Sequence, residues 1–414
     1  MFLSWRLTYN IVIQNAGKIL TIFLNIAILG YISRYLGVAG MGEYATIIRF
    51  IGLFGVIADF GLNVIVTREI ARKEKNENQI IGNAITLRVF TSVIILVLGA
   101  SIAQFFPYDP MIKKGIFLVL PAFWFTLQHQ ILNGLFLNRL KMDQVIGAEI
   151  ISRGVLLLGT VLLVQWKTSL TSFLYLLNVG NFVWFAVVFL LAYRYVPIRF
   201  KFDLNLQKKI FLSALPLAII NGFHLIYFNI DSIMLSLFKG NEALGIYHIA
   251  YKILETLFAM MVATVTLYIP LLSNELKVKK EMLLISLRKI EKTMAVISVL
   301  IMISGLLASK YIVLFISGKT FMEASNPLKI LFIASGFIFF NELFKHVFVV
   351  LDKQKSVVWI YACTAAFNVF ANLYFIPRYS YNGAALVTLL SEIMIFILSF
   401  IMMKKYSLKN GTVV

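Results

Sequence analysis

Two stretches of the chain share one pattern: Gly37-Val-Ala-Gly-Met-Gly42-Glu-Tyr44-Ala-Thr-Ile-Ile-Arg49 and Gly240-Asn-Glu-Ala-Leu-Gly245-Ile-Tyr247-His-Ile-Ala-Tyr-Lys252. Both read G-x-x-x-x-G-x-Y-x-x-x-x-[R/K], at an offset of 203 residues (240 minus 37). Each lies between two long apolar segments, where a glycine turn opens a new helix. The pattern therefore predicts two repeated helical hairpins, each with a cation about two turns inside its second helix. Chance recurrence is the alternative.

The composition excludes a soluble protein. The chain is 60% hydrophobic and 14% charged, and its mean hydropathy is +0.87, whereas soluble domains are about a quarter charged. Its apolar stretches reach the roughly 20 residues with which a helix crosses a bilayer, and they are too long for barrel strands. We expect an all-α polytopic membrane protein whose first apolar stretch is retained as a membrane anchor.

Hydropathy predicts twelve transmembrane helices, and most Lys and Arg of the connections fall on one side of this map, the cytoplasmic side by the positive-inside rule. Both termini are then cytoplasmic. The net charge of +19 comes mainly from these loops, and its spread argues against nucleic-acid binding. The predicted spans are 8–34, 42–67, 80–105, 112–136, 145–165, 171–194, 208–238, 243–272, 287–308, 325–351, 357–376 and 383–403.

A basic connection divides the chain into two halves of six spans. We predict an N-terminal lobe over 1–195, a cytoplasmic linker over 196–207 and a C-terminal lobe over 208–414. Because six is even, both lobes enter the membrane in the same direction and form a parallel repeat. Two such lobes favour a transporter that opens alternately to either side.

The first predicted helix carries a polar stripe of Asn10, Gln14, Lys18, Thr21 and Asn25, whose spacing places them on one helical face. At the same offset, Lys18 corresponds to Asn221 and Thr21 to His224. This recurrence favours a true repeat, and we expect the stripe to line a polar lumen.

Several ionisable residues fall inside predicted spans, where they are expensive and functional by default. The cations are Lys18, Arg49, Arg88, Arg153, Lys252 and Lys345, and the anions are Asp59, Glu149, Asp231, Glu255, Glu342 and Glu392. Three pairs could instead be structural, since Glu149 and Arg153, Lys252 and Glu255, and Glu342 and Lys345 lie one helical turn apart. Lys18, Arg49 and Asp231 lack such a neighbour and are the stronger lumen candidates.

The sequence shows no catalytic or metal-binding pattern. It has no nucleophile elbow, Walker A loop or metal-ligand spacing, and its single cysteine, Cys363, excludes an intramolecular disulfide. We therefore expect neither an enzyme nor a resident metal or cofactor. A membrane glycosyltransferase or polymerase would need an extramembrane catalytic loop, and none is visible.

Six segments carry a resemblance to a known family. They are Arg34-Tyr-Leu-Gly37, Gly42-Glu-Tyr44, Asp59-Phe-Gly61-Leu with Thr67-Arg-Glu-Ile-Ala71, Asp231-Ser-Ile-Met-Leu235, Gly245-Ile-Tyr247 and Tyr381-Asn-Gly383-Ala-Ala385. The chain resembles the polysaccharide-repeat (Wzx-type) flippases of the multidrug/oligosaccharidyl-lipid/polysaccharide exporter superfamily.

The resemblance implies a MATE-like fold in a bacterial or archaeal plasma membrane. It also implies transfer of a polyprenyl-diphosphate-linked oligosaccharide to the outer leaflet, with membrane lipids and polysaccharide-assembly proteins as partners. The expected diphosphate ligands are Lys18, Arg49, Arg88, Arg153 and Lys252, and a coupling Na⁺ or H⁺ would bind at Asp59, Asp231 or Glu392. The alternative is a cation-coupled multidrug exporter of the same fold. We expect Arg49 and Lys252 to share a basic cavity between the lobes if the first function is correct.

Overall fold

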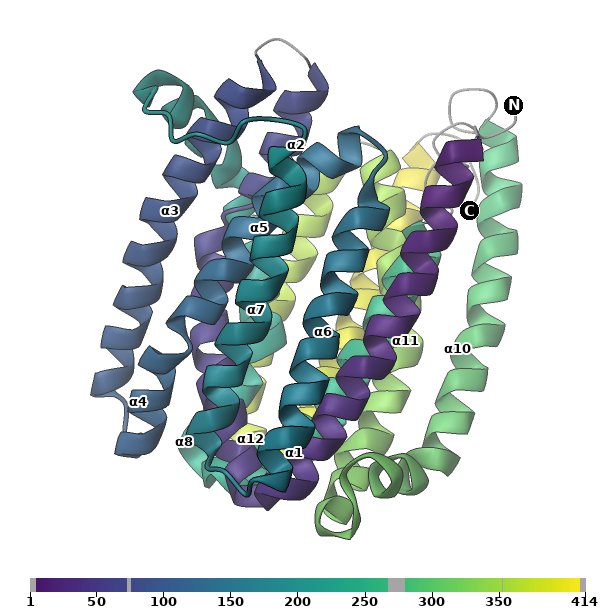
Figure 1. The fold of residues 1–414 in the computed structure, drawn as a ribbon. Helices are drawn as coiled ribbons and strands as arrows, with labels where there is room; N and C mark the ends of the chain where they lie inside the picture. The colour runs from purple at the N-terminus through teal and green to yellow at the C-terminus, as the bar shows by residue number, and fades with distance from the viewer. Residues whose placement is uncertain (1–4, 73–75, 267–279, 352, 410–414) are drawn as a thin grey trace. The chain divides into compact units, whose positions relative to one another are not determined.

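The computed structural model describes residues 5–72, 76–266, 280–351 and 353–409 (Figure 1). Over these ranges the chain is helical and contains no strand. The long helices are α1 (Trp5–Asp59), α2 (Leu62–Arg72), α3 (Glu77–Ile102), α4 (Pro110–Leu118), α5 (Leu120–Asn138), α6 (Met142–Gln165), α7 (Leu170–Tyr193), α8 (Leu204–Thr266), α10 (Lys280–Ser317), α11 (Ser325–Val350) and α12 (Gln354–Lys409). The described chain also contains two short 3₁₀ helices, η1 (Ala103–Phe105) and η2 (Lys319–Ala324).

The helices have the length and apolarity of membrane spans. Eight segments of the described chain qualify, and two of them, with 60 and 51 residues, are far longer than one crossing needs. Large apolar side chains remain exposed along α3, including Phe90 at 56% and Ile94 at 64%, as a lipid-facing surface requires. The expected all-α, multi-pass membrane architecture is confirmed, while the count of twelve spans stays a prediction.

Both copies of the repeated pattern begin with a glycine that interrupts a long helix. Gly37 lies in α1 with φ 66° and ψ −174°, and Gly240 lies in α8 with φ 80° and ψ −178°. This combination is essentially restricted to glycine, because a Cβ atom would clash with the backbone. The predicted glycine turns are confirmed, and the two share one backbone conformation.

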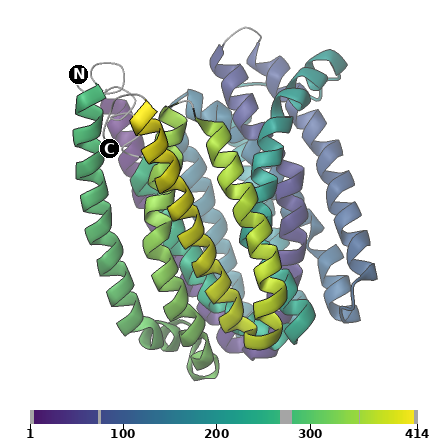
Figure 2. The same cartoon turned by 180° about the vertical axis from the view of Figure 1, so that it is seen from behind.

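A third interruption lies in α12, at Ser380, with φ 50° and ψ −135°. Figure 2 shows the two arms of this helix, yellow-green and yellow, side by side on either side of the turn. The turn falls between the spans predicted over 357–376 and 383–403, where the sequence Arg378-Tyr-Ser-Tyr-Asn-Gly383 supplies turn-forming residues.

Two of the predicted spans contain a break in the helix. The span expected over 42–67 ends at Asp59, because Phe60 (φ 47°) and Gly61 (φ 70°) are both left-handed, and α2 begins again at Leu62. The span expected over 112–136 is divided between α4 and α5 at Val119, just before Pro121. In both places the turn-forming residues override the apolar pattern.

The chain forms two compact units, Met1–Leu225 (unit 1) and Ile226–Val414 (unit 2), with the boundary inside α8. In unit 1, α1 packs on α6, α5 packs on α7, and α2 packs on α5. A buried apolar cluster of this unit draws on α2, α3, α5, α6 and α7 and includes the fully buried Val66, Ile81, Leu132 and Phe136. In unit 2, α11 packs against both α10 and α12. The lobe and linker boundaries given above stay predictions.

Candidate functional site

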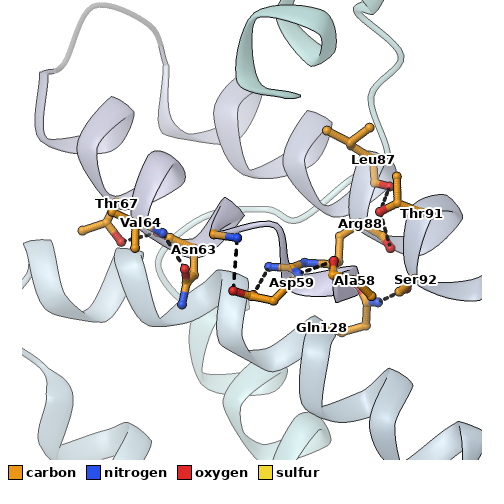
Figure 3. Close-up of polar contacts among 11 residues, drawn as sticks. Ala58, Asp59, Asn63, Val64, Thr67, Leu87, Arg88, Thr91, Ser92 and Gln128 are labelled. Carbon is orange, nitrogen blue, oxygen red and sulfur yellow. Dashed lines mark hydrogen bonds and ion pairs between the residues drawn. The ribbon is translucent and has the colours of Figure 1, made fainter. Parts of the chain in front are cut away.

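A buried ion pair joins α3 to the end of α1. Arg88 is fully buried, its Nη2 lies 2.8 Å from Asp59 Oδ1, and its Nη1 donates to the carbonyl of Ala58 at 2.9 Å (Figure 3). The other carboxylate oxygen of Asp59 accepts from the amide of Gly61 at 3.2 Å. The pair therefore caps α1 where its last carbonyls lose their helical partners. Arg88 is therefore directed into unit 1 and not toward the membrane surface.

A second cluster of unit 1 combines a cation with aromatic donors. The guanidinium of Arg153, on α6, lies 5.1 Å from the ring centre of Trp184 on α7. Trp184 stacks on His129, a buried residue of α5, with ring centres 4.1 Å apart. The indole N–H of Trp184 and both ring nitrogens of His129 are buried without a hydrogen-bond partner among the described residues. This cluster is rich in donors, a property that favours an anionic or oxygen-rich ligand.

The remaining candidates of unit 1 differ in exposure. Arg49 is buried at 8% exposure, and Lys18 is exposed. Thr21 is buried and donates to the carbonyl of Lys18 at 2.9 Å, whereas Gln14 and Asn25 are half-buried. The side chains of Asn10, Asn221 and His224 lie outside the described part of the structure, so the polar stripe stays a prediction there.

Buried carboxylates characterise unit 2. Asp231, on α8, is 1% exposed. Its Oδ2 accepts from the hydroxyl of Tyr247 at 2.5 Å, and its Oδ1 accepts from the amide of Ser232 at 2.6 Å. Tyr247 also lies 3.4 Å from the hydroxyl of Thr388 on α12. The spacing of the repeated pattern thus has a physical use here, because the tyrosine after the Gly240 turn hydrogen-bonds to the helix before that turn.

A second carboxylate, Glu392 on α12, is buried beside α8 and α11. Tyr227 donates its hydroxyl to Glu392, and the Asn341 amide donates to the carboxylate at 2.6 Å and to the Glu392 carbonyl at 2.9 Å. Nearby in α12, Asn368 donates to Ser391 at 3.1 Å. These buried oxygens create a region of negative potential inside unit 2.

Two of the expected one-turn ion pairs are present. Lys252 Nζ lies 2.9 Å from Glu255 Oε2, with the lysine side chain 45% exposed, and Lys345 lies 2.5 Å from Glu342, whose carboxylate is buried. An exposed pair of this kind contributes roughly 0 to 1 kcal/mol to stability. The pairing at Lys252 therefore leaves the side chain accessible to solvent or ligand.

The buried ionisable side chains differ in their balance of sign between the two units. Among the described residues, the buried Arg, Asp and Glu of unit 1 are Arg49, Arg88 and Glu69, while those of unit 2 are Asp231, Glu342 and Glu392. Unit 1 can consequently offer donors to an anion, and unit 2 can offer oxygens to a cation. No group of three or more His, Cys, Asp or Glu that could hold a metal ion occurs in the described ranges.

Sequence reasoning did not select Tyr227, Asn341, Trp184 or His129. Their only signal was polarity within apolar runs, as in Gln128-His129 and Asn341-Glu342. Tyr and Trp are common in membrane helices, and only the packing of different helices reveals that these side chains meet a carboxylate or a cation.

Comparison with protein-family profiles identifies the family of the chain. The profile of a family described as "Polysaccharide biosynthesis protein" matches residues 7–276. The chain belongs to the polysaccharide biosynthesis protein family. A second profile, MatE, matches residues 216–374 of this family member, so the resemblance drawn from the sequence is confirmed. None of the curated proteins matches the chain in sequence.

Solved structures share the fold of this polysaccharide biosynthesis protein over almost its whole length. The lipid II flippase MurJ in an inward closed conformation aligns with a TM-score of 0.80 at 13% identity, covering 96% of this chain and 87% of MurJ. An inward-facing multidrug resistance MATE transporter of the MOP superfamily aligns at 0.76 and 13%, covering 97% and 99%. A MOP superfamily transporter from Pyrococcus furiosus, described as having a binding pocket of reverse polarity, aligns at 0.66 and 14%, covering 98% and 95%. These matches confirm the MATE-like fold.

Proposed function

We propose that the protein is a flippase that moves a polyprenyl-diphosphate-linked oligosaccharide across the plasma membrane by alternating access. Membership of a polysaccharide biosynthesis family supports a glycan-related cargo, and the MurJ-like fold supports a carrier of a large amphiphile. The observation that carries the proposal is the set of buried cations and unpaired donors in unit 1, because a diphosphate needs such a set inside the membrane.

The phosphate ligands in this proposal are Arg49 and Arg153, together with the more exposed Lys18 and Lys252. The donor groups of Trp184 and His129 lie beside Arg153, whose charge also interacts with Glu149 one helical turn away on α6. A hydrogen bond from a charged donor to phosphate is roughly twice as strong as a neutral one. Arg88 does not contact the phosphate in this proposal and supports the site indirectly, since both its terminal nitrogens donate to the end of α1.

The oligosaccharide sets the second requirement. Each unpaired hydroxyl moved from water into hydrocarbon costs roughly 4 to 8 kcal/mol, so a saccharide crosses only along a polar path. In the proposed mechanism the polar stripe, including Gln14, Thr21 and Asn25, lines that path. The prenyl tail stays in lipid, and rigid-body rocking of the two predicted lobes provides alternating access.

The carboxylates of unit 2 suit a coupling cation. Asp231 and Glu392 are surrounded by the oxygens of Tyr247, Thr388 and Tyr227, which are the hard ligands that Na⁺ or a shared proton would use. Asp59 is a weaker candidate because Arg88 already occupies its carboxylate. The membrane potential supplies about 2.3 kcal/mol per charge per 100 mV, enough to drive an ion-coupled cycle. In the proposed membrane topology both termini are cytoplasmic. Polysaccharide-assembly proteins are the expected protein partners.

Reconstituted vesicles test the function. Wild-type protein should transfer a fluorescent undecaprenyl-diphosphate disaccharide between leaflets, as measured by quenching from one side. Replacing Arg153 by Ala should slow transfer at least 10-fold, while Arg139→Gln, a half-exposed cation of unit 1, should leave it unchanged. No transfer by the wild-type protein, or equal rates for both variants, would refute the assignment.

The carboxylate and tyrosine cluster of unit 2 favours a second candidate, a cation-coupled multidrug exporter. Such a protein would transport a lipophilic cationic dye, and the dye would compete with the coupling ion at Asp231. Dye efflux that is abolished by Asp231→Asn, combined with no transfer of the prenyl-diphosphate sugar, would select this function instead.

A further inference from the structure

A pocket of about 590 Å³ opens between α2 and α5 of unit 1. Asn63, Thr67 and Arg68 contribute from α2, Asn133 and Leu137 from α5, and Met142 from the start of α6. The volume falls in the usual range of roughly 300 to 1,000 Å³ for small-molecule sites. The candidate residues discussed above do not line it.

The lining has the chemistry of a carbohydrate site. The amides of Asn63 and Asn133 carry both donors and acceptors, as sugar hydroxyls require. The hydroxyl of Thr67 donates to the carbonyl of Asn63 at 2.7 Å and can accept a further hydrogen bond. The side-chain oxygen of Asn133 has no partner among the described residues. Val64, Leu137 and Met142 supply apolar surface for the C–H faces of a sugar ring.

The electrostatics of the pocket favour an uncharged ligand over a phosphate. Its cation, Arg68, lies 3.3 Å from Glu69 Oε1, and the same oxygen lies 3.4 Å from Arg72 Nη1. The charge of Arg68 is therefore partly compensated before any ligand arrives. The lining thus offers a diphosphate a single, partly compensated cation, whereas its amides and hydroxyl suit uncharged hydroxyl groups.

The wall formed by α2 is fixed in place by four features. The Phe60-Gly61 break sets its direction, and the Asp59–Arg88 pair holds that break from α3 (Figure 3). On the other side, a Cβ on Gly134 would lie 2.5 Å from Thr67 Oγ1, so the helices approach closely. Asn138 Nδ2 donates to the carbonyls of Thr67 at 3.1 Å and Gly134 at 2.8 Å. A rigid wall lowers the cost of ordering the site around a ligand.

We infer that this pocket is a saccharide subsite that binds sugar residues of the lipid-linked cargo, apart from the phosphate-binding cations. The inference rests on the proposed function. Its consequence is that sugar recognition and diphosphate recognition are separable: changes at Asn133 or Thr67 act on the glycan, whereas changes at Arg153 act on the diphosphate.

Binding measurements on purified, full-length protein test the separation. The probes are fluorescent undecaprenyl diphosphate and the same lipid carrying a disaccharide of N-acetylglucosamine and a hexose. Asn133→Leu, which removes the amide but keeps a side chain branched at Cγ, should weaken binding of the disaccharide lipid about 10-fold and leave the sugar-free lipid unchanged. Thr67→Val provides a second variant in case the first fails to fold, and Asn205→Ala, an exposed residue outside the pocket, is the matched control.

Three outcomes would overturn the subsite: equal affinity of the wild-type protein for both lipids, no effect of either pocket variant, or equal loss for both lipids. Failure of the proposed function has a different signature. In that case the wild-type protein transfers neither lipid in vesicles, whatever the variants bind.

Discussion

Removal of Arg88 gives the sharpest test of the architecture of unit 1. Its side chain is fully buried and its partner Asp59 is 17% exposed, at a separation of 2.8 Å. Breaking a buried pair by removing one partner costs about 3 to 5 kcal/mol, because the other charge stays buried and unpaired. Arg88→Gln and Asp59→Asn should each destabilise the protein by this amount.

The double variant separates pairing from any other role. Arg88→Gln with Asp59→Asn leaves two neutral amides that can still hydrogen-bond, and no uncompensated charge remains. Replacement of a whole buried ion pair is often close to neutral. The double variant should therefore recover most of the stability that either single variant loses.

Thermal unfolding of detergent-purified protein, followed by tryptophan fluorescence, provides the measurement. For a unit of this size, 1 kcal/mol corresponds to roughly 2 to 4 °C, so each single variant should lower Tm by roughly 6 to 20 °C. The control is Arg139→Gln, whose pair with Glu77 is about one-third exposed on both sides and contributes at most about 1 kcal/mol. A double variant as unstable as the sum of the two single variants would refute the reasoning.

Three further predictions use the same preparation. Gly37→Ala and Gly240→Ala should each cost about 1 to 3 kcal/mol of stability. The cost is backbone strain alone, because no neighbouring atom lies within 4 Å of either new Cβ. Gly147→Ala, equally unobstructed but inside α6, should be neutral or stabilising, and equal effects on Tm at all three positions would contradict this explanation. Gly134→Ala should cost about 1 to 3 kcal/mol by overpacking against Thr67 and weaken binding of the disaccharide lipid; unchanged Tm and binding would show that α2 yields. Asp231→Asn should abolish the dependence of transfer on a Na⁺ or H⁺ gradient. Tyr247→Phe removes the hydroxyl that donates to Asp231, and the loss of this hydrogen bond, worth about 1.5 kcal/mol, should reduce the transfer rate roughly 10-fold. Gradient dependence that survives Asp231→Asn would exclude this carboxylate from coupling.

Much of the fold could be predicted because its causes are local. Apolar length specifies a membrane helix, and a glycine between two such lengths specifies a turn, as at Gly37 and Gly240. The break at Phe60-Gly61 was not predicted. A bulky phenylalanine disfavours the left-handed conformation, and here that conformation follows a helix end that Arg88, distant in sequence, caps.

The candidate charges show the same division. One-turn spacing was enough to anticipate the pairs of Lys252 with Glu255 and of Lys345 with Glu342, because partners on one helix are fixed by its period. The pairing of Asp59 with Arg88 and of Glu392 with Tyr227 and Asn341 depends on which helices become neighbours. Hydropathy carries no information on that choice.

By itself the sequence determined that the chain resides in a lipid bilayer and that it is helical. A chain this apolar must satisfy its backbone hydrogen bonds within helices, since lipid offers no partners. The tertiary structure alone decided which charges meet, because contacts across helices depend on packing rather than on sequence spacing. It placed cations and free donors in unit 1 and protected carboxylates in unit 2, and it formed the pocket between α2 and α5. The proposed functions depend on that distribution of charge.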